Sequence, residues 1–111
     1  MEKKGAAAFG EITIDFDRMQ LKRSGRTIAA TAQEFRILRF FVNNPECVFT
    51  RKELLGAAWP KRNRLSSRTV DNYILHLRQK LEHDPSSPSY LQTVHSIGYK
   101  FVPFPEKGRS R

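Results

Sequence analysis

Hydrophobic and polar residues alternate along the first thirty positions of the chain. The apolar members of this alternation are Ile12, Ile14, Phe16, Met19 and Leu21. A period of two is typical of strands with one buried face. Ser24 and Gly25 follow and include a residue that tolerates a positive φ, so we expect a hairpin turn there. The pattern predicts a small antiparallel sheet whose apolar face needs a covering layer.

Two helices with the same start signal are predicted next. The segments 31–34 and 50–53 both have the sequence Thr-x-x-Glu. This is the spacing of a capping box, in which each side chain bonds the backbone N–H of the other residue. Apolar residues recur at helical spacing after each box, and Pro45 and Pro60 stop the two helices.

A third helix is predicted over residues 66–82, with Ser66 suited to its N-cap and Pro85 closing it. Apolar residues at i, i+4, i+7 and i+11 form one stripe and are expected to face the core. These residues are Val70, Ile74, Leu77 and Leu81. The opposite face carries Arg68, Asn72, Leu75, His76, Gln79 and His83, with Tyr73 and Arg78 on its flanks.

Residues 90–102 are predicted to form strand, tight turn and strand. The order is therefore sheet, three helices and terminal hairpin. This predicts an α+β fold, a winged helix-turn-helix with an N-terminal antiparallel β-sheet, three helices and a C-terminal β-hairpin wing. We expect one domain over residues 8–104, with flexible tails at 1–7 and 105–111.

Composition narrows the class of protein. The 111 residues carry a formal net charge of +9, which favours a polyanionic partner, either nucleic acid or an anionic membrane surface. Cys47 is the single cysteine, so no disulfide forms within the chain, and we expect it to be a small buried residue. No apolar run is long enough to span a bilayer, which predicts a cytoplasmic chain without a membrane partner.

Motifs of catalysis are missing from the sequence. It contains no glycine-rich phosphate loop, no Gly-x-Ser-x-Gly and no His-Glu-x-x-His. His76 and His83 lie seven residues apart, and no third ligand stands at a useful spacing. We therefore predict a protein that is not an enzyme, with no metal and no cofactor.

The outward face of the third predicted helix carries chemistry suited to base edges. Asn72 and Gln79 can each pair with adenine through a donor and an acceptor, and Leu75 suits a thymine methyl group. His76 can donate to a base edge or a phosphate, and Arg68 is placed to bind a phosphate. The alternative is an ordinary surface on which Leu75 packs against a neighbouring loop.

Basic residues stand beside this helix. Lys61, Arg62 and Arg64 form a run that alone is typical of a solvated loop, but next to the helix it suits phosphate positioning. Trp59 fits two roles, either in the core or with its indole N–H on a phosphate.

Four stretches together resemble a known family. They are residues 31–41, residues 50–55 with Trp59, residues 68–81 and residues 93–101. Over about residues 8–104 the chain resembles the C-terminal DNA-binding domain of OmpR/PhoB-type two-component response regulators.

The resemblance implies that the third helix enters the major groove of double-stranded DNA and that the wing lies in the adjacent minor groove. It implies base-proximal roles for Asn72, Leu75, His76 and Gln79. Phosphate contacts are expected from Arg51, Trp59, Arg68, Thr69, Tyr73 and Arg78. Wing contacts are expected from His95, Ser96, Ile97 and Lys100. A loop that contacts RNA polymerase is expected at Lys61, Arg62, Asn63 and Arg64.

The resemblance also implies partners. Members bind direct-repeat promoter sites as tandem homodimers and carry a receiver domain on their N-terminal side. Because these residues include no such domain, we expect either a fragment of a longer regulator or regulation by another route. Family wings carry Arg-Gly-x-Gly-Tyr where this chain has His95 and Ser96 at the first two positions. Many members also have arginine where this chain has Leu75 and His76. The remaining alternatives are a winged helix that binds protein and a nonspecific nucleic-acid binder.

Overall fold

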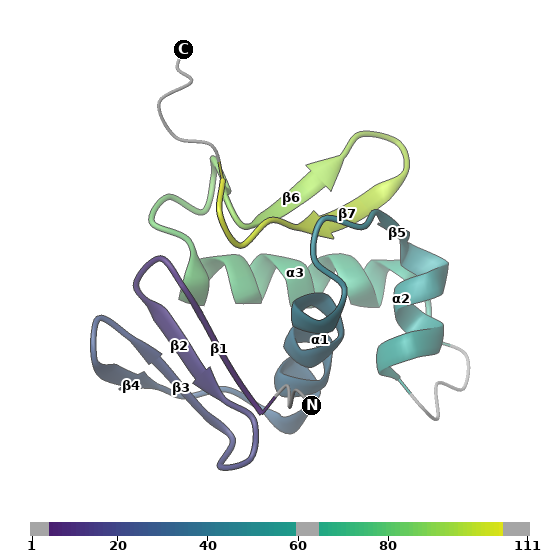
Figure 1. Cartoon of the computed structure of the whole chain (residues 1–111). Coiled ribbons are helices and arrows are strands. Elements are labelled where there is room, and N and C mark those ends of the chain that lie inside the picture. Colours follow the sequence, from purple (N-terminus) through teal and green to yellow (C-terminus); the bar gives the residue numbers. More distant parts are fainter. Residues whose placement is uncertain (1–4, 60–64, 106–111) are drawn as a thin grey trace.

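A computed structural model describes residues 5–59 and 65–105, in which three helices lie between two small antiparallel sheets (Figure 1). The helices are α1 (Ala32–Asn43), α2 (Arg51–Ala58) and α3 (Ser67–Leu81). The strands are β1 (Ala6–Phe9), β2 (Ile12–Asp15), β3 (Gln20–Arg23), β4 (Arg26–Ile28), β5 (Phe49–Thr50), β6 (Leu91–Val94) and β7 (Gly98–Phe101). None of the helices in this part of the chain is both long and apolar enough to cross a lipid bilayer. The predicted order of sheet, helices and terminal hairpin is confirmed.

The N-terminal sheet has the strand order β1-β2-β3-β4, with every neighbouring pair antiparallel. The predicted turn at Ser24 and Gly25 joins β3 to β4, and both residues have a positive φ. The sheet begins earlier than the predicted domain boundary at residue 8. Ala6 pairs with Asp15 and Ala7 with Ile14, so both alanines belong to an edge strand. Three consecutive alanines carry no alternation from which that strand is predictable.

Both capping boxes are present in the structure. The Glu34 backbone N–H donates to Thr31 Oγ1 (3.1 Å), and the Thr31 N–H donates to Glu34 Oε1 (2.8 Å). Thr50 and Glu53 make the same exchange at the start of α2. The C-terminal end of α2 is held by α1, because Gln33 Nε2 donates to the Ala58 carbonyl oxygen (2.7 Å).

The third helix runs from Ser67 to Leu81, within one residue of the predicted bounds 66–82 at each end. Glu82 is 1% exposed, and its carboxylate accepts the backbone N–H groups of Ser89, Tyr90 and Leu91. A carboxylate that accepts several N–H groups fixes the chain where it turns towards β6. Arg23 of β3 donates to the Lys80 and Glu82 carbonyl oxygens, two of the acceptors that a helix end leaves unpaired. At the other end Ser66 is the N-cap, but its side chain makes no cap hydrogen bond.

The wing sheet has the order β5-β7-β6, so the predicted hairpin carries a third strand. The two-residue strand β5 pairs Phe49 with Tyr99 and Thr50 with Gly98. A Cβ atom at Gly98 would collide with the Phe49 carbonyl oxygen, so this position requires glycine. Strand β5 thereby connects the wing directly to the start of α2 (Figure 1).

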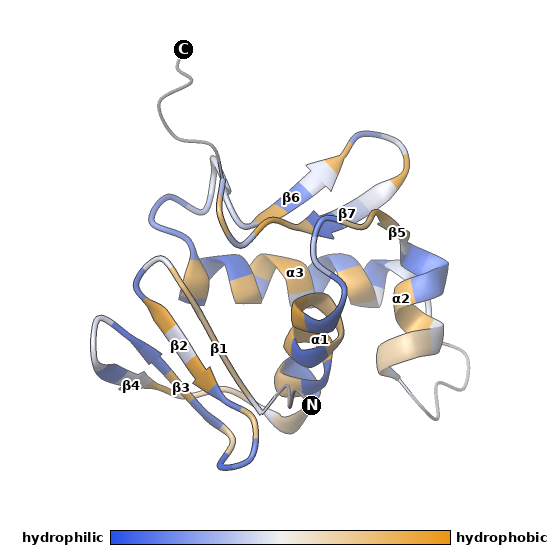
Figure 2. Ribbon diagram, viewed as in Figure 1, coloured by the Kyte–Doolittle hydropathy of each residue, from blue (hydrophilic) through white to orange (hydrophobic). Residues whose placement is uncertain are grey.

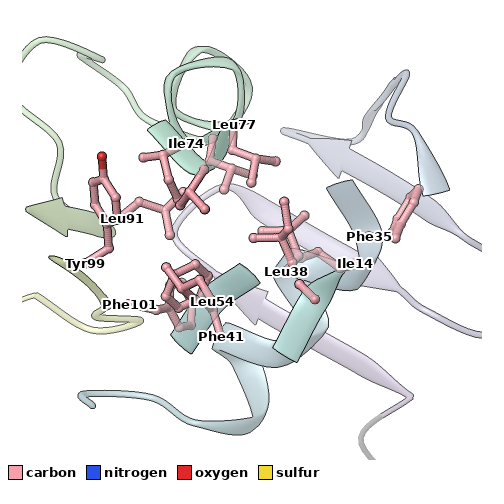
Figure 3. Close-up of a cluster of buried hydrophobic side chains, with 14 of the residues drawn as sticks. Ile14, Phe35, Leu38, Phe41, Leu54, Ile74, Leu77, Leu91, Tyr99 and Phe101 are labelled. Atoms are coloured by element: carbon pink, nitrogen blue, oxygen red, sulfur yellow. The ribbon is translucent and has the colours of Figure 1, made fainter. Parts of the chain in front are cut away.

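The core lies where α1, α2 and α3 meet both sheets. Figure 3 shows Leu38 and Phe41 of α1, Leu54 of α2 and Ile74 and Leu77 of α3 turned towards one another. Apolar residues run along the inner faces of the helices, and hydrophilic ones lie outside (Figure 2). Cys47 is exposed, contrary to its predicted burial, because it lies in the connection between α1 and β5 rather than on a packed face.

Candidate nucleic-acid interface

The predicted stripe and outward face of α3 are separated as the sequence indicates. Burial of the four stripe residues is complete or nearly so, with exposed fractions of 1%, 1%, 0% and 2% at Val70, Ile74, Leu77 and Leu81. The opposite face is open. Its exposed residues are Arg68, Asn72, Leu75, His76 and Gln79. Leu75 is 52% exposed, so it does not pack against a neighbouring loop within the described residues.

Three side chains of this face line up along the helix. At about 100° per residue, Asn72, Leu75 and Gln79 fall within roughly 60° of one another. Their spacing along the axis spans about 10 Å at 1.5 Å rise per residue. The face therefore presents two amides and one aliphatic group in a single row. A major groove admits an α-helix, so such a row can face the base edges there.

Arg78 has a contact that the sequence did not predict. Its Nε donates to the Leu91 carbonyl oxygen (2.9 Å), and Nη2 donates to Thr93 Oγ1 (2.8 Å). Its Cζ also lies 5.6 Å from the centre of the Tyr99 ring. The structure thus places the Arg78 guanidinium against the wing, between α3 and β6. Its contact with a phosphate stays a prediction.

Lys80 is also held by a partner inside the molecule. Its Nζ lies 2.7 Å from Glu34 Oε1, and Glu34 is 4% exposed. This ion pair joins the end of α3 to the start of α1. Because Glu34 also completes the capping box of α1, one carboxylate serves both helices.

Asp71 joins three elements near the start of α3. Arg51 Nε and the Tyr99 hydroxyl both donate to Asp71 Oδ1, each at 2.6 Å. In Figure 3 the Tyr99 hydroxyl points away from the labelled core side chains. Burial raises the pKa of Asp71, but the hydrogen bonds from Tyr99 and Arg51 and the charges of Arg51 and Arg68 outweigh it and hold that pKa below its ordinary value. Burial and the nearby Asp71 carboxylate raise the pKa of Tyr99.

The sequence did not predict the contacts that Asp71, Thr93 and Tyr99 make within the chain. The partners of Asp71 lie 20 and 28 positions away along the chain, and Thr93 lies 15 positions from Arg78. No periodicity within one element connects residues at such separations. Together these contacts fix the angle between the wing and α3.

Trp59 and Tyr73 lie beside the start of α3. Trp59 is 7% exposed and belongs to the hydrophobic core, which was one of its two expected roles. Its ring meets Tyr73 edge to face, with centroids 5.3 Å apart. Tyr73 is half-buried and Thr69 likewise, whereas Arg68 is exposed. Arg68 is therefore the most accessible of the predicted phosphate-binding residues on α3.

The wing ends in an open turn of His95, Ser96 and Ile97. The Ile97 N–H donates to the Val94 carbonyl oxygen (2.9 Å), and Ser96 has a φ of 66°. Ile97 is 52% exposed at this tip, and His95 and Ser96 are exposed as well. Lys100 lies further down β7 and is half-buried.

Two further predictions concern the polymerase-contact loop and metal binding. The residues of the predicted polymerase-contact loop, Lys61, Arg62, Asn63 and Arg64, lie outside the described residues. Over 5–59 and 65–105, no cluster of three or more His, Cys, Asp or Glu side chains is arranged to hold a metal ion.

Comparison with known proteins supplies the context of this interface. A family model described as "Transcriptional regulatory protein, C terminal" matches residues 25–101. The chain is 36% identical over 98 residues to the transcriptional regulatory protein YvrH of Bacillus subtilis, covering 88% of this chain and 41% of that protein. The chain spans between 39% and 42% of the length of the curated relatives it matches.

Solved structures are similar over the same region. The response regulator DrrB of Thermotoga maritima, an OmpR/PhoB homolog, matches with a TM-score of 0.79 and 35% identity, over 88% of this chain and 44% of that one. The RstA DNA-binding domain of Klebsiella pneumoniae, solved in complex with the RstA box, matches with a TM-score of 0.76 and 28% identity, over 88% of this chain and 97% of that one.

Proposed function

The chain belongs to the transcriptional regulatory protein C-terminal family, the OmpR/PhoB-type effector domains, and from this premise we propose that it binds specific sites on double-stranded DNA. In this function α3 enters the major groove and the turn at residues 95–97 lies in the adjacent minor groove. The function involves no catalysis and belongs in the cytoplasm, where promoter DNA lies.

The observation that carries the proposal is the exposed row on α3. Asn72, Leu75 and Gln79 are exposed together, although a face meant only for water is usually filled with paired acidic and basic residues. Asp71 is the acidic residue of α3, and its carboxylate is engaged by Arg51 and Tyr99. The row thus offers hydrogen-bonding and apolar groups to base edges without a facing negative charge.

Phosphate contacts from both sides of the row position the helix. Arg68 and Thr69 lie in the first turn of α3, whose N-terminal end carries a partial positive charge. Arg51 reaches the same end through its contact with Asp71. Tyr73 and Lys100 extend these contacts along the flank and the wing. Such contacts fix register on the duplex and carry little sequence information.

We also propose an assembly for the whole protein, in which only the additional domain is supported by the length of the relatives. Because the curated relatives are more than twice as long as the matched region, we assign to the whole protein a receiver domain in cis. On DNA, two copies bind direct repeats as a tandem homodimer, and residues 61–64 contact RNA polymerase. The whole protein then acts in a two-component phosphorelay.

Selection of bound duplexes from a random pool tests the proposed function. The 111-residue chain is expected to enrich one motif and to bind it about 10³-fold or more tightly than unrelated duplex. Equal affinity for every sequence would instead support a nonspecific nucleic-acid binder. Failure to retain any duplex would leave the outer face of α3 to a protein partner and would overturn the proposal.

A further inference from the structure

The chemistry of the exposed row on α3 is unusually restricted. Asn72 and Gln79 end in amides, and Leu75 ends in two methyl groups. An amide pairs in a bidentate way with the N6 and N7 groups of adenine, and an aliphatic group contacts the methyl group of thymine. Guanine is contacted most often by arginine or lysine, which bond O6 and N7 together. The row between Asn72 and Gln79 contains neither.

Two basic side chains beside the row, Arg78 and Lys80, are bound elsewhere. Arg78 donates to the Leu91 carbonyl and to Thr93, and Lys80 is paired with Glu34. His76, at the edge of the row, can donate a single hydrogen bond, and the purine N7 that would accept it is common to adenine and guanine. Arg68 precedes the row by one turn and is assigned to phosphate. A count of basic residues in α3 therefore overstates its capacity to contact guanine.

The wing tip gives a second and independent indication. Ile97 is 52% exposed, and it stands between Ser96 and Gly98 at the end of the hairpin. The minor groove of a G·C pair carries the N2 amino group of guanine, a donor that an aliphatic side chain desolvates without replacing its hydrogen bond. An A·T pair lacks this group. An isoleucine at the tip therefore favours A·T pairs in the minor groove.

We infer that the DNA site of this chain is A·T-rich both where the row from Asn72 to Gln79 meets the major groove and where Ile97 meets the minor groove. The inference rests on the proposed function and adds the kind of base pair that the DNA site contains. Asn72, Leu75, Gln79 and Ile97 are its specificity-determining residues. They suit the groups of adenine and thymine and offer no bidentate donor to guanine.

Selection from the random pool distinguishes failure of the inference from failure of the proposed function. We expect an enriched motif with A·T pairs at both contacted segments. An enriched motif with G·C pairs at either segment overturns the inference and leaves specific DNA binding intact. Absence of any enriched motif overturns the proposed function itself.

Modified base pairs then identify which groove is read at each position. Inosine·cytosine has the major-groove groups of G·C and the minor-groove groups of A·T, and diaminopurine·thymine has the opposite combination. In the α3 segment, inosine·cytosine should weaken binding by roughly fivefold or more per pair, and diaminopurine·thymine should be tolerated. In the wing segment diaminopurine·thymine should weaken binding, and inosine·cytosine should be tolerated. Equal effects of both modified pairs at both segments would contradict the inference.

A variant pair assigns the minor-groove effect to the wing. Ile97→Ala should reduce the discrimination against diaminopurine·thymine in the wing segment and leave the discrimination in the α3 segment unchanged. Met19→Ala is the matched control, because Met19 is 49% exposed in the turn between β2 and β3 of the other sheet. Unchanged discrimination in Ile97→Ala, with its circular dichroism equal to that of the unsubstituted chain, would overturn the role of Ile97.

Discussion

Ser96 shows how one residue departs from the pattern of its family without changing the turn. Family wings carry glycine at this position, and the φ of 66° observed here is one that glycine adopts freely. A residue with a Cβ atom in this region raises the free energy of the folded state by about 1–2 kcal/mol. Ser96 keeps the same three-residue turn despite this strain. The turn geometry is therefore set by the hairpin and not by Ser96.

Substitution at Ser96 tests this explanation. Ser96→Gly should leave the free energy of unfolding unchanged or raise it by up to about 1 kcal/mol, because relief of strain opposes the larger backbone entropy of glycine. Ser96→Val should lower it by about 1–2 kcal/mol, because a β-branched residue fits a positive φ least. Urea unfolding measures both changes. A glycine variant as unstable as the valine variant would show that Ser96 is not strained.

Gln79 and Arg68 of α3 are predicted to contribute to DNA binding in different ways. Gln79→Ala should weaken binding to the selected site by about 1–3 kcal/mol and relax preference at one base pair. Arg68→Ala should weaken all sequences alike, since it removes a phosphate contact. Titration of both variants against the selected duplex and a scrambled one measures this. A change of sequence preference in Arg68→Ala but not in Gln79→Ala would reverse the assignment of the face.

At the scale of elements, the wing and α3 behave as one unit because polar contacts join them. Asp71 of α3 accepts from Arg51 at the start of α2 and from Tyr99 of β7. Arg78 of α3 donates to Leu91 and Thr93 of β6. Side chains from two helices and two wing strands thus hold the hairpin at a fixed angle to α3. Binding in two adjacent grooves requires such an angle.

Acid should weaken this junction first at Asp71. Its folded-state pKa is below the ordinary value of 3.8, so its contribution to stability is present above that value and is lost as the pH falls further. The stability difference between the chain and its Asp71→Asn variant should therefore be constant above about pH 5 and shrink below pH 4. Acid titration followed by urea unfolding checks this.

Tyr99→Phe isolates one contact of the junction. It removes the hydroxyl that donates to Asp71 and keeps the ring, so the pKa of Asp71 should rise towards its ordinary value. Titration of the Asp71 carboxyl carbon by NMR reports the change. An Asp71 that titrates at its ordinary value in the unsubstituted chain would contradict the junction.

The elements that the sequence predicts are those with local signals. The stripe from Val70 to Leu81 and both capping boxes depend on residues within one helix, and the structure confirms them. Strand β5 was missed because two residues show no period, and its pairing partner Gly98 lies far along the chain. The contacts of Arg78 and Asp71 were missed for the same reason. Periodicity predicted which face of α3 is exposed. It did not predict the hydrogen-bond and ion-pair partners that hold Arg78 and Lys80 within the molecule.

At the scale of the whole molecule, charge and shape serve the same surface. The net charge of +9 attracts a polyanion from a distance, and the two sheets hold α3 and the wing tip in place for close contact. In the proposed function the fold therefore combines long-range attraction of DNA with local recognition of its bases.

Salt dependence measures the electrostatic share of binding. The logarithm of the association constant should fall linearly with the logarithm of salt concentration, because cations condensed on DNA are released. Arg68→Ala should reduce the slope by about 1, and Gln79→Ala should leave it unchanged. Filter binding at several salt concentrations gives the slopes. Equal slopes for the chain and Arg68→Ala would remove Arg68 from the phosphate contacts.

The central claim is that DNA meets the side of α3 that turns away from the core, together with the wing tip. Backbone chemical shifts of the 111-residue chain, recorded by NMR as the selected duplex is added, test this claim most directly. We predict that changes concentrate at residues 68–79 and 95–97 and leave β1 to β4 largely unaffected. Changes confined to β1 to β4, with α3 and the wing tip unperturbed, would contradict the account.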